Sequence, residues 1–115
     1  GRILMAHPIH HALSSAKRFG GEPGDYQAIH DWLDATKELY ADFRHRALRH
    51  NSHGVFEAER VFGLSITNST GKEVPVRPIA EQHITEDLGF VPPPSEWLRW
   101  IEPQSWMNSP MKLSK

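Results

Sequence analysis

The sequence predicts an α-dominant α+β fold of four to five helices with one β-hairpin. Apolar residues recur at helical spacing in most of the chain, and a turn containing Asn and Gly separates two short alternating stretches. The 115 residues suit one domain, which we place at residues 5–107. Residues 1–4 read as a cloning remnant before Met5, and residues 108–115 as a flexible tail.

Two helices are predicted before residue 50. The first begins at His7-Pro8 and ends at Gly20-Gly21, residues that favour the backbone conformation of a helix C-terminus. The second is expected to be the longest and to run unbroken over about residues 26–49. Its apolar positions keep a period of about 3.6 residues; they are Ile29, Trp32, Leu33, Thr36, Leu39, Tyr40, Phe43, Ala47 and Leu48.

The remaining elements are shorter. A third helix is predicted over residues 55–62, and a hairpin over residues 64–76 turns at Asn68-Ser69-Thr70-Gly71. A fourth helix covers residues 78–88, a proline connector follows it, and a short last helix begins at Ser95. We expect the tryptophans to lie mainly in the core; they are Trp32, Trp97, Trp100 and Trp106.

Composition excludes several classes of protein. Thirteen basic and fourteen acidic residues give a formal net charge of −1, without the basic excess typical of nucleic-acid-binding domains. The basic run over residues 44–50 is expected to pair with Asp42, Glu57 and Glu59 instead. The absence of cysteine excludes disulfides and thiolate metal sites, and it fits a reducing cytoplasm. No apolar stretch approaches the ~20 residues of a membrane span.

Eight histidines are the strongest chemical feature. Neutral imidazole binds zinc, nickel and ferrous iron, and a site needs three or four donors that converge from different elements. There is no His-Glu-x-x-His or other compact motif, so any site must be assembled by the tertiary structure. The leading interpretation is therefore a small cytoplasmic protein that binds one divalent transition metal, with metal-dependent hydrolysis as a further possibility.

Helix geometry limits the choice of ligands. On an unbroken second helix, His30 and His45 would lie about 22 Å apart and could not share an ion. His45 and His50 could converge if the helix ended between them, which Asn51-Ser52 permits. We predict that the metal ligands are His10, His45, His50 and His83, all within ~10 Å of one another, and that the carboxylates orienting them are Glu59, Glu81 and Asp87.

Several strings resemble a family of small, histidine-rich bacterial proteins of unknown function. They are HPIHHA at 7–12, IHDW at 29–32, HRALRH at 45–50 and EQHITEDLG at 81–89. The resemblance covers residues 5–107 and implies no assigned activity. It places all of the histidines except His53 in the family pattern, and Glu59 matches that pattern as well.

A second interpretation is a non-enzymatic binding or accessory module, in which the histidines are structural or respond to pH. It shares one expectation with the first, a homodimer. A lone hairpin has exposed edges that invite pairing, and the last helix is apolar on more than one face. Two-fold association is the commonest way to bury such surfaces; on the last helix they belong to Trp97, Leu98, Trp100 and Ile101.

Overall fold

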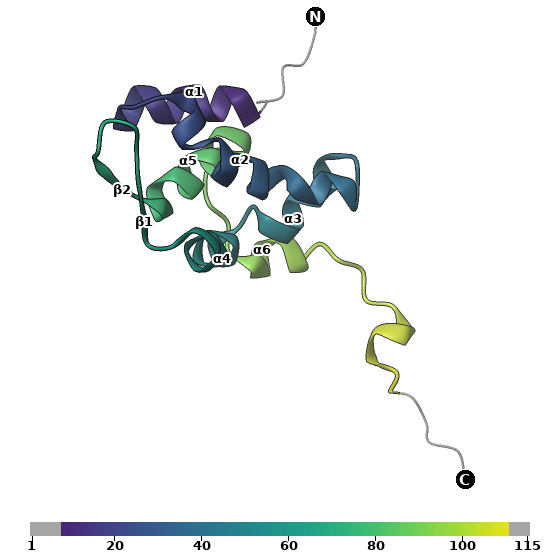
Figure 1. Ribbon diagram of the computed structural model, residues 1–115. Coiled ribbons are helices and arrows are strands. Elements are labelled where there is room, and N and C mark those ends of the chain that lie inside the picture. The colour runs from purple at the N-terminus through teal and green to yellow at the C-terminus, as the bar shows by residue number, and fades with distance from the viewer. Residues whose placement is uncertain (1–7, 111–115) are drawn as a thin grey trace, which may run out of the picture.

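The computed structural model describes residues 8–110 and arranges them as helices around a central one (Figure 1). Within these residues there are six α-helices and one two-stranded antiparallel hairpin, which confirms the α-dominant α+β prediction. The helices are α1 Pro8–Phe19, α2 Gln27–Asp34, α3 Arg46–Arg49, α4 Ser52–Phe62, α5 Val76–Leu88 and α6 Pro94–Leu98; the strands are β1 Ser65–Thr67 and β2 Glu73–Pro75.

Helix α5 is the centre of the fold because it packs against α1, α2, α4 and β1. It supplies Ile79, Ala80 and Ile84 to the core, where they meet Ile29 and Leu33 of α2. The other buried core residues are Tyr26, Val55, Ala58, Val74 and Val76. Two polar side chains of α5, Gln82 and His83, are buried as well, whereas Arg77, Thr85 and Glu86 are exposed.

The hairpin forms as predicted and is the only regular β-structure between residues 8 and 110. Ile66 pairs with Val74 at the middle of the register. The turn is stabilised by Asn68, whose side-chain oxygen accepts hydrogen bonds from the backbone of Thr70 and Lys72. Gly71 has a φ of 85°, a conformation that few residues other than glycine adopt.

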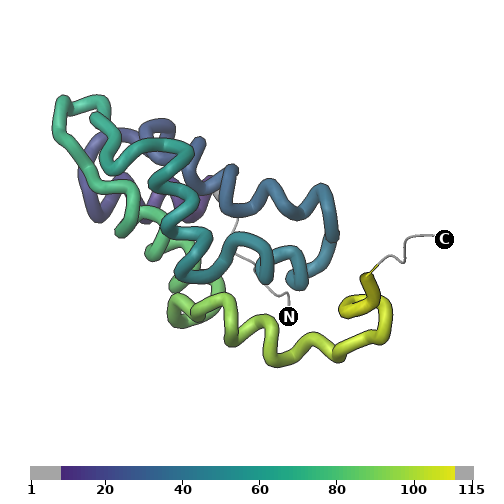
Figure 2. The backbone as a smooth tube through the Cα atoms, turned by 90° about the horizontal axis from the view of Figure 1, so that it is seen from below, coloured from purple at the N-terminus to yellow at the C-terminus, as the bar shows by residue number. Residues whose placement is uncertain are grey.

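The predicted unbroken helix over residues 26–49 is wrong. Helix α2 ends at Asp34, a 3₁₀ turn covers Ala35–Glu38, and the chain then reverses before α3. Figure 2 shows residues 35–45 as a loop that stands out from the body. Asp42 starts the returning turn by accepting a hydrogen bond from the backbone of Arg44. The apolar residues of the loop face outward, and Leu39 is 74% exposed.

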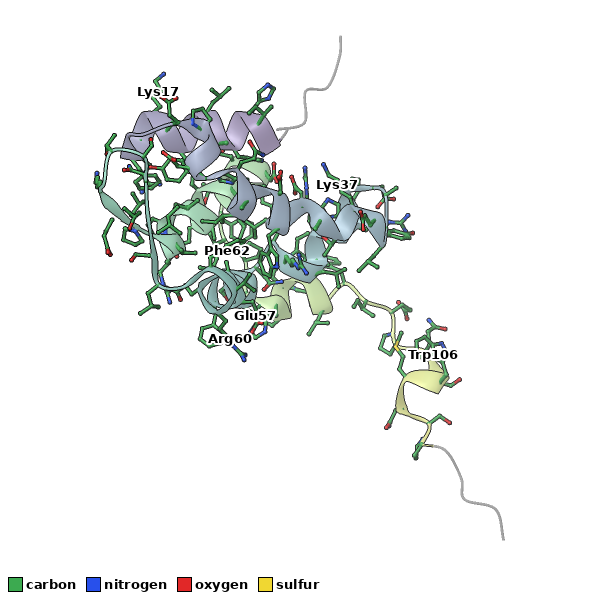
Figure 3. The ribbon with its side chains drawn as sticks, in the orientation of Figure 1. Lys17, Lys37, Glu57, Arg60, Phe62 and Trp106 are labelled. Atoms are coloured by element: carbon green, nitrogen blue, oxygen red, sulfur yellow. The ribbon has the colours of Figure 1, made fainter. Side chains whose placement is uncertain are left out.

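The C-terminal segment departs from the body after α6 (Figure 1), and Figure 3 shows Trp106 on it, away from the helices. Trp100 is 76% exposed and Trp106 is 72% exposed, so the expectation that they lie in the core is wrong. Trp32 and Trp97 are partly buried. Within the predicted tail, Asn108 ends a 3₁₀ turn, whereas residues 1–4 and 111–115 lie outside the described residues.

No helix in the described part of the chain has the length and apolar character needed to cross a membrane.

Candidate metal centre

Four side chains from three parts of the fold meet beside α5. They are Asp34 at the end of α2, His50 directly after α3, and His83 and Asp87 on α5. Each offers one nitrogen or carboxylate oxygen, and these four donor atoms all lie within 4.8 Å of one another. The arrangement brings two imidazoles and two carboxylates to one point in the interior.

Helix periodicity accounts for three of the four positions. His83 and Asp87 are four residues apart, so they share one face of α5. Asp34 lies one helical turn after His30, another buried histidine, on the face of α2 that packs against α5. The two helices therefore present matching His/Asp pairs, of which three members reach the donor group.

His50 is positioned by the junction between α3 and α4. The backbone amide of His50 donates to the carbonyl of Arg46, and the backbone carbonyl of His50 accepts a hydrogen bond from the indole of Trp97 over 2.9 Å. The next helix begins close against this turn: a Cβ on Gly54 would collide with the backbone carbonyl of Arg49. Glycine at position 54 therefore permits the tight junction that aims the His50 ring at α5.

The spacing of the four donors matches a small coordination sphere. His50 Nε2 lies 2.9 Å from Asp87 Oδ2 and 3.5 Å from Asp34 Oδ1. His83 Nε2 lies 3.3 Å and 3.2 Å from the same two oxygens. Four ligands at the usual zinc distances of 2.0–2.1 Å in a tetrahedron are separated by about 3.3 Å. The four nitrogen–oxygen separations thus scatter around the tetrahedral value.

The group is enclosed. The imidazoles of His50 and His83 are fully buried, and the side chains of Asp34 and Asp87 are 6% and 2% exposed. Two cations stand at its edge, with Lys37 Nζ 4.0 Å from Asp34 and an Arg46 nitrogen 3.7 Å from Asp87. A positive charge between two carboxylates buried at one point stabilises their ionised forms.

The pKa values of the four groups are set by burial and by the hydrogen bonds between them. Burial raises the pKa of Asp34 and of Asp87, but hydrogen bonds from the histidines outweigh burial and hold both pKa values below the ordinary range. Burial lowers the pKa of His83, yet the two carboxylates outweigh it and raise that pKa overall. Burial lowers the pKa of His50. In the metal-free protein the two carboxylates therefore favour the charged form of His83.

Three further buried histidines border the group. The ring of His11 lies 3.7 Å from that of His83, and its Nε2 is 3.3 Å from Asp87 Oδ1. The ring of His45 lies edge-on to His50 at 5.7 Å, and its Nε2 is buried without a hydrogen-bond partner among the described residues. His30 Nδ1 lies 3.0 Å from His83 Nδ1. Burial, followed by the charges of His83 and His11, lowers the pKa of His30 to about 3.

The structure brings together part of the predicted set. His50 and His83 are two of the four donors, Asp87 is a donor although it was expected to orient ligands, and His45 borders the group. His10 is exposed on α1, and its neighbour His11 faces the site instead. Glu59 forms an ion pair with Arg77, and Glu81 on α5 is half-buried; neither is one of the four donors.

Sequence reasoning missed Asp34 as a donor. A signal was present, because His30 and Asp34 repeat the i, i+4 spacing of His83 and Asp87 and lie beside the apolar positions Ile29 and Leu33. The assumption of an unbroken helix concealed it, since that helix would have carried the chain away from α5 instead of returning it at residue 45.

Comparison with known families gives the class of the chain. Residues 6–107 match a domain of unknown function, DUF6915, so the chain belongs to this family. This confirms the prediction of a family of unknown function. No curated protein and no solved structure matched the chain.

Proposed function

We propose that this protein binds one divalent transition metal ion through Asp34, His50, His83 and Asp87. The observation that carries the proposal is the convergence of two imidazole nitrogens and two carboxylate oxygens at nitrogen–oxygen separations of 2.9–3.5 Å. Buried carboxylates are otherwise costly, and a divalent ion would neutralise both at once.

Zinc suits this donor set best. It accepts imidazole and carboxylate ligands together, and it takes four ligands in a tetrahedron without a geometric preference of its own. Ferrous iron accepts the same donors but usually retains open positions, and nickel favours square-planar geometry with nitrogen and oxygen ligands. We therefore rank zinc ahead of iron and nickel.

The enclosure favours a structural role for the ion over hydrolysis. A catalytic zinc keeps one coordination position for water or substrate, whereas structural sites use four protein ligands. Here four protein donors are available and the side chain of each is at most 6% exposed. An ion at this point would join the end of α2, the α3–α4 junction and α5, and so lock the three elements together.

A zinc titration tests the proposal. Protein prepared without a histidine tag and stripped by a chelator should bind one equivalent of Zn²⁺ with a Kd below about 1 μM, the range that structural zinc sites reach. His50→Ala should weaken binding at least about tenfold, because it removes a donor. The matched control is His53→Ala, which removes an exposed histidine three residues away. Equal binding by the wild type and His50→Ala would refute the assignment.

A homodimer is a second proposal, and exposed apolar side chains beside α6 support it. A groove of about 460 Å³ is lined by Arg44, Ala47, Trp97, Trp100 and Ile101. The C-terminal segment carries the exposed Trp106 and Met107 away from its own body (Figure 3). We propose that this segment fills the groove of a second copy, because aromatic anchors in apolar pockets dominate such contacts.

Light scattering decides the state of association. The full chain should have a dimer mass at micromolar concentration, and Trp106→Ser should have a monomer mass. Leu64→Ser is the control, since Leu64 is equally exposed but lies beside the hairpin. A monomer mass for the wild type that persists as concentration rises would show the dimer proposal to be wrong.

A further inference from the structure

The nitrogen of His83 that points away from the carboxylates is the start of a buried row of polar side chains. His83 Nδ1 lies 3.0 Å from His30 Nδ1, and His30 Nε2 lies 2.8 Å from the hydroxyl of Ser15. That hydroxyl lies 2.8 Å from the amide oxygen of Gln82. The row crosses from α5 to α2, then to α1, and returns to α5.

The donor and acceptor in each hydrogen bond of this row can be deduced from its far end, at Gln82. The amide nitrogen of Gln82 donates to the backbone carbonyl of His11 over 3.0 Å and to a carboxylate oxygen of Glu86 over 3.2 Å. Both partners only accept, so the atom that Gln82 turns to Ser15 is its amide oxygen. Ser15 must then donate its single hydroxyl proton to Gln82.

The role of Ser15 as a donor to Gln82 also determines which nitrogens of His30 and His83 carry hydrogen. Because the Ser15 proton is used on Gln82, the Ser15 oxygen must accept the contact from His30, so His30 Nε2 carries a hydrogen. His30 is fully buried, and among the described residues its ring nitrogens contact Ser15 and His83 but no carboxylate that could balance a charge. A neutral ring avoids the cost of burying an unpaired charge, so the Nδ1 of His30 is an acceptor. The 3.0 Å contact between the two Nδ1 atoms is then a hydrogen bond that His83 donates.

We propose that His30, held by Ser15 and Gln82, is a positioning residue that selects the tautomer of His83. With its hydrogen on Nδ1, a neutral His83 presents the lone pair of Nε2 to the point between Asp34 and Asp87. A metal-binding histidine that donates its other N–H to a fixed acceptor is held in orientation and becomes a better ligand. This inference rests on the proposed metal site, and it identifies His30 as the residue that orients the ligand His83.

Two substitutions at position 30 distinguish the effect of losing the hydrogen-bond acceptor from the effect of losing the ring. His30→Leu removes the acceptor, whereas the side-chain oxygen of His30→Asn can occupy the place of Nδ1. We expect His30→Leu to weaken Zn²⁺ binding by about 10- to 100-fold, the usual effect of losing such a partner. His30→Asn should stay within about threefold of the wild type, on the same reasoning. Ser15→Ala, a minimal change in size, should weaken binding in the same direction as His30→Leu.

Nitrogen-15 NMR of zinc-loaded wild-type protein provides the readout that a merely structural role would not move. His83 should show a protonated Nδ1 and a zinc-bound Nε2, and this result can be obtained even where His30→Leu does not fold. A zinc-bound Nδ1, or unchanged affinity in His30→Leu and Ser15→Ala, would overturn this inference but not the proposed metal site. Failure of the wild type to bind zinc would overturn the proposed function, and the inference with it.

Discussion

Addition of zinc to the metal-free protein should raise its Tm by on the order of 15 °C. The four donors come from α2, α5 and the α3–α4 junction, so the site exists only in the folded chain. An ion at about 1,000 times its Kd stabilises the folded state by roughly 4 kcal/mol. For a domain of this size, each kcal/mol corresponds to about 4 °C. Scanning calorimetry with excess Zn²⁺, compared with a scan in chelator, measures the shift.

The control for this result uses two aspartates of the same helix. Asp34→Asn keeps the shape of the side chain but removes a charged donor, so its Tm should respond little to zinc. Asp31→Asn should respond as the wild type does, because Asp31 is exposed and accepts a hydrogen bond from Gln27 on the surface. Equal shifts in both variants would place the bound ion elsewhere, for example on exposed histidines.

His83→Leu should cost the metal-free protein about 3–5 kcal/mol of unfolding free energy, the usual loss when one partner of a buried ion pair is removed. The two carboxylates raise the pKa of His83 and so favour its charged form, and its Nε2 lies within 3.3 Å of an oxygen of each. Leucine would remove one of the two imidazoles that contact both buried carboxylates, while Lys37 and Arg46 would remain at their edge. Urea unfolding in chelator measures the difference.

His53→Leu provides the comparison for this loss. His53 is exposed and contacts Glu57 over 3.5 Å on one face of α4, so its replacement should change stability by less than about 0.5 kcal/mol. A loss below about 1 kcal/mol in His83→Leu would mean that His83 does not carry the charge that balances Asp34 and Asp87 in the folded protein.

The fold class could be predicted because its signals are local. Gly63 and Gly89 end helices α4 and α5 where the sequence indicated, and the Asn68 turn forms the hairpin from residues within a few positions of it. His83 and Asp87 could be paired for the same reason, since four residues on one helix fix their common face. A helix end at Asn51-Ser52 was the signal that His45 and His50 could converge; His50 is one of the donors and His45 borders the group.

The path of the chain between Asp34 and His45 could not be predicted from periodicity. Leu39, Tyr40 and Phe43 continue the apolar period of α2, yet all three are exposed. The reversal depends on the Asp42 turn and on a tertiary contact, the 2.8 Å hydrogen bond between Thr36 and His45. Because the reversal returns His50 to the end of α2, the role of Asp34 depends on the same contacts.

Elemental analysis of protein purified without a histidine tag tests the central claim most directly. The wild type should retain about one equivalent of zinc or another divalent transition metal per chain, as expected of a closed site with four protein donors. The double variant Asp34→Asn/Asp87→Asn keeps every histidine and both side-chain shapes, and it should retain less than about a tenth of that amount. A metal-free wild type, or equal metal in the two proteins, would contradict a metal site at Asp34, His50, His83 and Asp87.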